Sequence, residues 1–289
     1  MSFGDRLIRS IAKNKAIDKT GDRIASAFDE MTGRLQSRDK VLDVLHGTWL
    51  GHPLHPVLTD LPIGAWAFAG VLDALSIGKH RTNPGADAAI GFGIAAAIPT
   101  AMAGAADWRQ TDGEARRIGV AHALLNSGAL SCYVVSMLLR PKQAGLARLF
   151  GFMGLGFVGV SGYLGGHLLA ASRIGTKHES EASPPRQTVD VHMRDDLPED
   201  KPTQVDVNGL PVVLVRHGGN VYALADICPH LGCSLSEGWV DGDAIVCGCH
   251  GSAFALKDGR VLKGPSSYSV DAYETTRPNG SVHIGPPRE

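Results

Sequence analysis

The sequence predicts an α-helical polytopic membrane domain with four transmembrane helices, followed by a small all-β domain. Four apolar segments near the middle of the chain each approach or exceed the ~20 residues that a helix needs to cross a bilayer. Toward the C-terminus the pattern changes to short apolar runs between Gly- and Asn-containing turns, which is typical of strands. With 289 residues there is room for both domains. We expect a basic amphipathic leader, the membrane domain, a linker and the β domain at residues 1–50, 51–172, 173–190 and 191–289.

The leader carries apolar residues near helical spacing, with Lys and Arg between them and no signal-peptide core. These apolar residues include Leu7, Ile8, Ile11, Ile24, Phe28, Met31 and Leu35. The pattern predicts one or two amphipathic helices that lie on the membrane surface. A helix packed on a neighbouring domain has the same pattern, so both interpretations stay open.

The four apolar segments are residues 57–77, 88–106, 118–139 and 149–172, and short polar loops separate them. The simplest arrangement is four antiparallel transmembrane helices. Gly162 and Gly166 are four residues apart, a spacing that lets membrane helices approach closely. We expect this pair at a helix–helix contact.

The β domain is predicted from short apolar runs at residues 205–207, 212–215, 221–224 and 268–270. The dipeptides Asn208-Gly209 and Gly219-Asn220 separate the first three runs and are typical of hairpin turns. The result is a small antiparallel domain with two longer loops at one tip.

Those two loops contain the motifs that predict chemistry. The first reads Cys228-Pro-His230 and the second Cys247-Gly-Cys249-His250. Two cysteines and two histidines divided between two motifs suit a Rieske [2Fe–2S] centre, where one iron binds both sulfurs and the other binds both imidazoles. Cys228 and Cys247 would then hold one iron, and His230 and His250 the other. A Cys2His2 zinc site uses the same ligand types, but a zinc finger keeps its cysteines together and its histidines together on a helix.

The two motifs resemble those of the Rieske family, specifically its high-potential branch in quinol-oxidising complexes. The resemblance implies that Cys233 and Cys249 form a disulfide between the cluster loops, and that Pro265 belongs to the loop that covers the cluster. It also implies that Ser252 donates a hydrogen bond to a cluster sulfur. Phe254 stands where that branch has a tyrosine hydroxyl donor. We therefore expect a lower potential than in centres that keep both donors.

A second, weaker resemblance covers residues 45–172. His52-Pro, His55-Pro and Pro62-Ile-Gly64 are similar to the signature of a bacterial membrane-domain family of unknown function. Because the function of this family is unknown, the resemblance does not indicate any chemistry. The placement of the polar residues is the remaining indication of what the domain binds.

Five polar residues of the membrane domain fall on one membrane face if its helices alternate in direction: His52, His55, Asp107, His122 and His167. Asn126 lies one turn below His122 on the same face of its helix. An even number of helices places the β domain on that same face. Ionisable groups inside membranes are costly and usually mark a function. Three interpretations compete: two histidines ligate a b-type haem, the group lines a quinone pocket, or the residues form only structural hydrogen bonds.

The charged residues indicate which partners the chain has and how it is oriented in the membrane. The net charge of −1 gives no indication of a nucleic-acid partner. Lys and Arg in the leader and in the second loop favour a cytoplasmic N-terminus in a bacterial cytoplasmic membrane, which places the Rieske domain in the cytoplasm. A disulfide is unusual there.

The function that these patterns predict is membrane-anchored electron transfer, in which the cluster exchanges electrons with a haem or quinone site at the membrane face. The expected partners are the lipid bilayer and a quinone or another redox protein. A Rieske oxygenase component and a redox-sensing membrane module are the alternatives.

Overall fold

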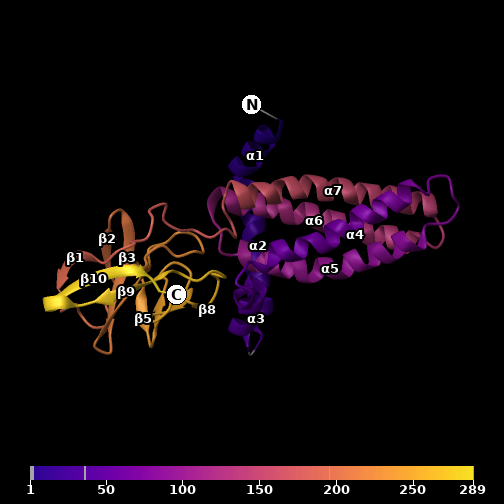
Figure 1. Cartoon of the computed structure of the whole chain (residues 1–289). Coiled ribbons are helices and arrows are strands. Elements are labelled where there is room, and N and C mark those ends of the chain that lie inside the picture. Colours follow the sequence, from indigo (N-terminus) through magenta and orange to yellow (C-terminus); the bar gives the residue numbers. More distant parts are fainter. Residues whose placement is uncertain (1–2, 36, 195, 289) are drawn as a thin grey trace. The chain divides into compact units, whose positions relative to one another are not determined.

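A computed structural model describes all residues of the chain except 1, 2, 36, 195 and 289. The chain divides into two compact units, a helical one and a β one (Figure 1). The helical unit comprises residues 1–38 and 54–173, and the β unit comprises residues 39–53 and 174–289. The predicted leader is therefore shared between the units, and residues 174–190 belong to the β unit.

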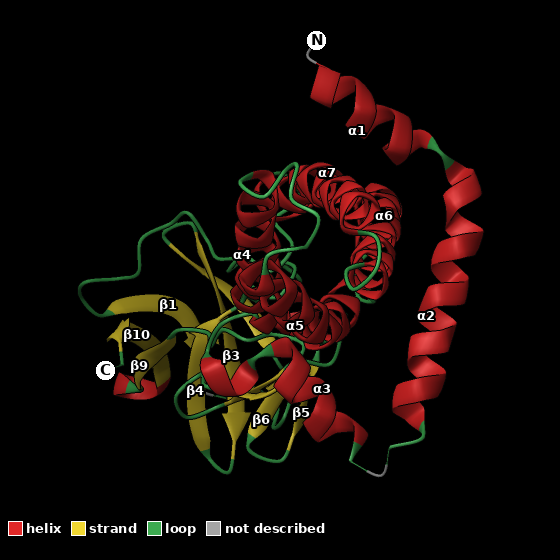
Figure 2. Cartoon of the chain, turned by 90° about the vertical axis from the view of Figure 1, so that its right-hand side faces the viewer, coloured by secondary structure: helices red, strands yellow, loops and turns green. Residues whose placement is uncertain are grey.

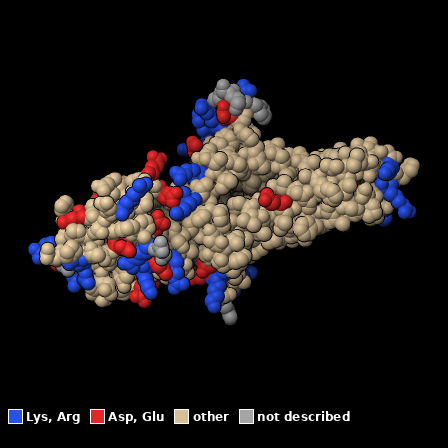
Figure 3. Space-filling model, in the orientation of Figure 1, with Lys and Arg blue, Asp and Glu red and all other residues tan. Residues whose placement is uncertain are grey.

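Six helices form the helical unit: α1 (Phe3–Lys13), α2 (Asp18–Gly33), α4 (Leu54–Ala74), α5 (Pro84–Trp108), α6 (Gly113–Leu139) and α7 (Ala144–Ala170). The last four are long and apolar enough to cross a membrane, which confirms the predicted class. Viewed along the bundle, α4 lies across from α6, with α5 and α7 between them (Figure 2). The flank of these helices is covered almost entirely by uncharged side chains (Figure 3).

The membrane helices begin before the apolar segments that predicted them, and α4 and α7 also end before the predicted ends at residues 77 and 172. Asn83 caps α5 by accepting a hydrogen bond from the Gly85 N–H at 2.8 Å, and Pro84 occupies the first helical position. As a result Asp87 lies inside α5. Arg148 lies inside α7, whose first residue is preceded by Gln143 without a side-chain cap. The start of α5 thus depends on a capping residue, which hydropathy does not detect.

The leader helices pack on the membrane helices of the same unit. A small apolar cluster joins α1 to α6 and α7 through Ile8, Ala12, Ile118 and Leu164. Asp18 of α2 pairs with Arg117 of α6 at 2.8 Å, and Asp22 pairs with Arg116 at 3.2 Å. Of the two interpretations of the leader, packing on a domain describes these helices.

The β unit contains two antiparallel sheets. The larger has the order β1-β10-β9-β4-β3-β2, formed by Val189–Arg194, Ser281–Pro287, Ala272–Thr276, Asn220–Ala225, Leu210–His217 and Thr203–Val207. The smaller has the order β5-β6-β7-β8, formed by Trp239–Asp241, Ala244–Val246, Ala253–Ala255 and Val261–Lys263. Helix α3 (Arg38–His46) and the 3-10 helix η2 (Thr48–Leu50) precede α4. The smaller sheet supports the second motif loop, between β6 and β7.

The two hairpin turns follow the predicted pattern with one correction. Val207 pairs with Leu210 across a two-residue turn whose residues both have positive φ, as predicted. The next turn uses Gly218 and Gly219, one residue earlier than predicted, because both positions require positive φ.

The predicted strand at residues 268–270 is wrong. This segment lies in the loop between β8 and β9. Val270 donates its N–H to the Gly259 carbonyl at 3.0 Å, and Ser266 bonds the Tyr268 carbonyl. The segment makes these separate contacts instead of a strand ladder, although its residue types favour a strand.

Candidate metal centre

Two loops with the same backbone pattern present the candidate ligands. In the first, Cys228 donates its N–H to the Cys233 carbonyl at 2.8 Å, and Gly232 donates to Cys228 at 2.9 Å. In the second, Cys247 and Gly251 repeat the pattern, with Gly251 donating to the Cys247 carbonyl at 3.0 Å. Gly232 and Gly251 have φ of 83° and 79°, a conformation that favours glycine. Cys228 and Cys247 therefore each lie in a tight turn that is closed by a glycine four residues later.

A disulfide between Cys233 and Cys249 joins the two loops. The pairing that the family resemblance implied is confirmed. The bond brings the turn that contains Cys228 and His230 next to the turn that contains Cys247 and His250.

The remaining two motif cysteines are buried free thiols that hydrogen-bond each other. The bond from Cys228 lowers the pKa of Cys247 to about 6, and the backbone N–H groups of Cys249 and His250 act in the same direction. The same hydrogen bond, followed by burial, raises the pKa of Cys228. These hydrogen bonds favour the thiolate form of Cys247, which is the form that binds metal.

The two motif histidines lie face to edge, with ring centroids 4.9 Å apart and ring planes at 84°. Nδ1 of His230 is buried and has no hydrogen-bond partner among the described residues. Burial, followed by the charges of His250, His46 and His178, lowers the pKa of His230 to about 3, so its ring is neutral. A buried ring nitrogen without a partner is costly, and a bond to a metal satisfies it. The donor set and this nitrogen fit a [2Fe–2S] cluster.

The residues around the two thiols include the three neighbours of the cluster that the resemblance to the Rieske family implied. Ser252 is completely buried, and its Oγ accepts a hydrogen bond from the Ser266 N–H at 2.9 Å. Phe254 is completely buried in β7, opposite Ile245 of β6, and brings no hydroxyl. Pro265 follows a cis peptide bond in the loop after β8.

Comparisons with known proteins agree with this geometry. Residues 187–274 match the family model described as Rieske [2Fe-2S] domain. Over 93 residues the chain is 33% identical to the 3-phenylpropionate/cinnamic acid dioxygenase ferredoxin subunit of Escherichia coli (strain K12), covering 32% of this chain and 87% of that protein. The chain belongs to the Rieske family. Its Rieske domain is accordingly an electron-transfer domain of the [2Fe–2S] type.

Other comparisons extend the likeness to both domains. Ferredoxin CarAc of Metapseudomonas resinovorans is 36% identical over 78 residues, covering 27% of this chain and 73% of that protein. The solved ferredoxin of carbazole 1,9a-dioxygenase from Nocardioides aromaticivorans IC177 is 28% identical, with a TM-score of 0.32, and the match covers 36% of this chain and 99% of that one. Residues 51–178 match a family described as predicted membrane protein (DUF2231).

Within that membrane domain, the structure brings His55 of α4 and His122 of α6 together. Their ring centroids are 6.4 Å apart, and the rings are perpendicular at 89°. Nδ1 of His55 donates to the Thr100 carbonyl on α5, and Nδ1 of His122 donates to the Ser161 carbonyl on α7, both at 2.9 Å. Because a carbonyl only accepts, each neutral ring keeps its lone pair on Nε2. Asn126 donates to Nε2 of His122 at 3.0 Å.

The two histidines occupy equivalent places in two helical hairpins, α4–α5 and α6–α7. Each bonds a carbonyl that lies four residues before a glycine, namely Gly104 on α5 and Gly165 on α7. A Cβ at Gly104 would lie 2.7 Å from Cε1 of His55, and one at Gly165 would lie 3.0 Å from Cε1 of His122. These glycines make room for the rings. The sequence offers no separate signal for either of them among its many glycines.

Three other residues were predicted for this site. His52 belongs to the β unit, where its ring lies against Tyr268 at a centroid distance of 5.2 Å. Asp107 and His167 are partly exposed at the ends of α5 and α7, and among the described residues no hydrogen bond joins His167 to either ring. The predicted close contact at Gly162 and Gly166 is wrong, because an added Cβ meets nothing within 4 Å at either position. These two glycines lie on the exposed side of α7.

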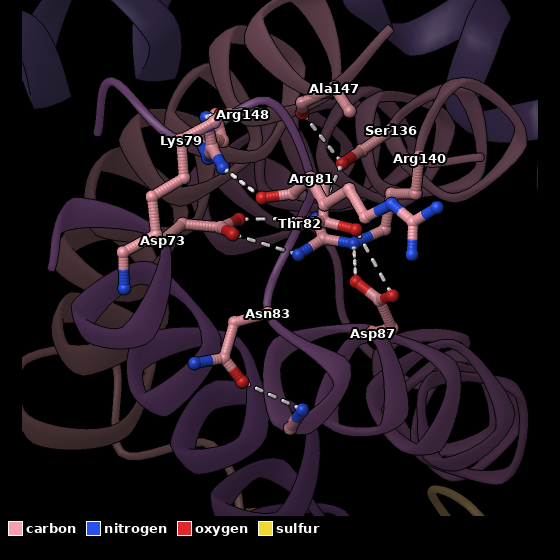
Figure 4. A network of polar contacts seen from close by, with 11 residues as sticks. Asp73, Lys79, Arg81, Thr82, Asn83, Asp87, Ser136, Arg140, Ala147 and Arg148 are labelled. Carbon is pink, nitrogen blue, oxygen red and sulfur yellow. Dashed lines mark hydrogen bonds and ion pairs between the residues drawn. The ribbon is translucent and has the colours of Figure 1, made fainter. Parts of the chain in front are cut away.

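An ionic cluster that was not predicted from the sequence lies at the opposite end of the four helices from His55 and His122 (Figure 4). Arg140 bonds both carboxylate oxygens of Asp73, at 2.8 and 3.1 Å, and also pairs with Asp87. The side chains of Arg140 and Asp73 are each 3% exposed. Beside them Arg148 donates to the backbone carbonyls of Lys79 and Arg81. The only sequence signal was the charge of Asp73 within an apolar segment.

Proposed function

We propose that this protein is a membrane-anchored electron-transfer protein whose Rieske cluster exchanges electrons with a second redox group in the membrane domain. Cys228 and Cys247 hold one iron of the cluster, and His230 and His250 hold the other. The cluster supplies a one-electron carrier. The protein supplies the two cysteine sulfurs, the two imidazoles and the disulfide that joins the two loops.

The separation of the membrane imidazoles favours haem as the second group. Metal–imidazole bonds of roughly 2 Å would put two ring centres about 6 Å apart when both rings flank one ion. The observed 6.4 Å between His55 and His122 is close to this value. The rings come from helices on opposite sides of the bundle, where helical proteins commonly hold cofactors. This separation is the observation that carries the proposal.

The remaining groups orient the rings. The carbonyls of Thr100 and Ser161 fix the tautomer in which Nε2 is the metal-binding atom. A haem would be held by Nε2 of His122, the atom that the Asn126 amide bonds at 3.0 Å. A quinone is the second candidate, because the Asn126 amide can donate to a quinone oxygen and Nε2 of His122 can accept from a quinol hydroxyl.

Chain connectivity and relatives support the pairing of the two redox groups. His52 of the β unit and His55 of α4 are separated in sequence only by Pro53 and Leu54. The similar proteins are named as ferredoxin subunits of dioxygenases, which suits a one-electron carrier. Delivery of electrons to an oxygenase is therefore the alternative use of the cluster. The distribution of Lys and Arg favours a cytoplasmic Rieske domain.

The test is the visible and electron-paramagnetic spectrum of the purified full-length protein. We expect haem bands together with a Rieske signal. His55→Ala or His122→Ala should remove the haem bands and leave the Rieske signal, while the control His167→Ala should keep both. A wild-type protein without haem bands whose cluster is reduced by quinol would favour the quinone site. If quinol reduces it at the same rate in all three variants, the histidines are structural and the proposal fails.

A further inference from the structure

A segment far from the Rieske match in sequence contacts the loop that contains Pro265. Residues 39–53, which include most of α3 and all of η2, belong to the β unit. Asp43 Oδ1 accepts a hydrogen bond from the Gly264 N–H at 2.8 Å. One turn earlier, Asp39 pairs with Lys263 Nζ at 2.8 Å. We call residues 39–53 the strap.

Side chains of the strap pack closely against Gly264. A Cβ at this position would lie 3.2 Å from Asp43 Oδ1, 3.2 Å from Thr48 Cγ2 and 3.3 Å from His46 Cδ2. His46 is only 4% exposed. A glycine at residue 264 therefore leaves just enough space for three strap side chains, and the Asp43 hydrogen bond is protected from water on that side.

From Gly264 the contacts continue toward the cluster ligands. The Ser266 N–H donates to Ser252 Oγ at 2.9 Å, and both serines are almost completely buried. The Ser252 hydroxyl in turn hydrogen-bonds Cys228. A hydroxyl has a single proton, so an Oγ that accepts from Ser266 directs its own proton to the sulfur. The order of the loop at residues 264–266 thus decides how well Ser252 donates.

We propose that Asp43 is a positioning residue that tunes the Rieske cluster by holding the 264–266 loop, and through it the Ser252 hydroxyl, in place. The inference rests on the proposed cluster ligands but not on the proposed haem or quinone site. Hydrogen bonds to cluster sulfurs stabilise the reduced, more negative cluster and raise its potential. Loss of the hydrogen bond between Asp43 and the Gly264 N–H should therefore lower the potential.

The experiment is a redox titration of the full-length protein with chemical mediators, followed by the electron-paramagnetic signal. Asp43→Ala should shift the midpoint downward, and Asp43→Asn, which keeps an acceptor oxygen, should shift it less. Asp39→Ala is the matched control on the same helix and should leave the midpoint unchanged. Ser252→Ala should lower the midpoint at least as far as Asp43→Ala, and the double variant Asp43→Ala/Ser252→Ala should go no lower than Ser252→Ala.

Amide hydrogen exchange gives a second readout that needs no cluster. Peptides covering residues 261–268 should exchange faster in Asp43→Ala than in Asp39→Ala. An unchanged midpoint in Asp43→Ala with an intact cluster would overturn the proposal, as would additive shifts in the double variant. If Asp43→Ala cannot hold a cluster, the midpoint of Asp43→Asn decides: a downward shift supports the proposal, and the wild-type value overturns it. Failure of the haem or quinone test would leave these outcomes unaffected.

Discussion

The two ends of the four membrane helices hold different kinds of polar group. At one end Arg140 is charged and bound by Asp73 and Asp87 (Figure 4). At the other, Nδ1 of His55 and Nδ1 of His122 each donate to a backbone carbonyl. Buried charges survive only when they are paired, whereas a neutral imidazole keeps a lone pair after it has donated its proton.

This difference separates a structural site from a binding site. In the ionic cluster both carboxylate oxygens of Asp73 already accept from Arg140. The cluster joins α4, α5 and α6 and leaves little bonding capacity for a ligand. The imidazole end retains two Nε2 atoms, one of them held only by the Asn126 amide. We therefore assign stability to the first end and ligand binding to the second.

The largest expected effect comes from breaking the ionic cluster. Asp73→Ala leaves Arg140 without its main partner in a buried site, and should lower the free energy of unfolding by roughly 3–5 kcal/mol. Thermal unfolding of the detergent-solubilised protein measures this. Asp60→Asn, at an exposed position of the same helix, is the control. The double variant Asp73→Leu/Arg140→Met should recover part of the loss, and a stable Asp73→Ala protein would contradict the structural assignment.

A substitution at the imidazole end should reduce the amount of bound cofactor much more than it reduces the stability of the protein. Gly104→Ala puts a methyl group 2.7 Å from the His55 ring, which has to move away from its Thr100 partner. We expect loss of the bound cofactor, with a change in stability of about 1 kcal/mol for the weakened hydrogen bond. Gly162→Ala, which meets nothing within 4 Å, is the matched control. Equal cofactor content in the two variants would show that the ring position does not matter.

The smallest effect concerns a histidine that is paired with a carboxylate instead of a carbonyl. His217 of β3 contacts Asp200 at 2.5 Å, and this hydrogen bond raises the pKa of His217. A raised pKa in the folded state adds stability that is complete below the unfolded value of about 6.5 and disappears as the pH rises through the folded value. The melting temperature of the β unit should fall slightly across this window. Asp200→Asn should flatten the dependence, and an unchanged slope would exclude the pair as its source.

Local patterns in the sequence determined much of this protein. Apolar length alone identified the four membrane helices, because each span has to satisfy its backbone internally over about 20 residues. The divided Cys-His motifs identified the [2Fe–2S] domain, because ligand types and spacing follow from the chemistry of the metal. The turn at Asn208 and Gly209 was equally local, since both residues tolerate positive φ.

Only the tertiary structure decided which distant residues meet. Asp73 and Arg140 are 67 positions apart, and His55 bonds a carbonyl 45 positions away. No periodicity relates such pairs, because contacts of this kind depend on how whole helices pack. The same holds for Asp43, which looked like part of a surface leader but bonds a loop 221 positions later. Hydropathy marks which segments are buried, and packing selects the partner of each buried polar group.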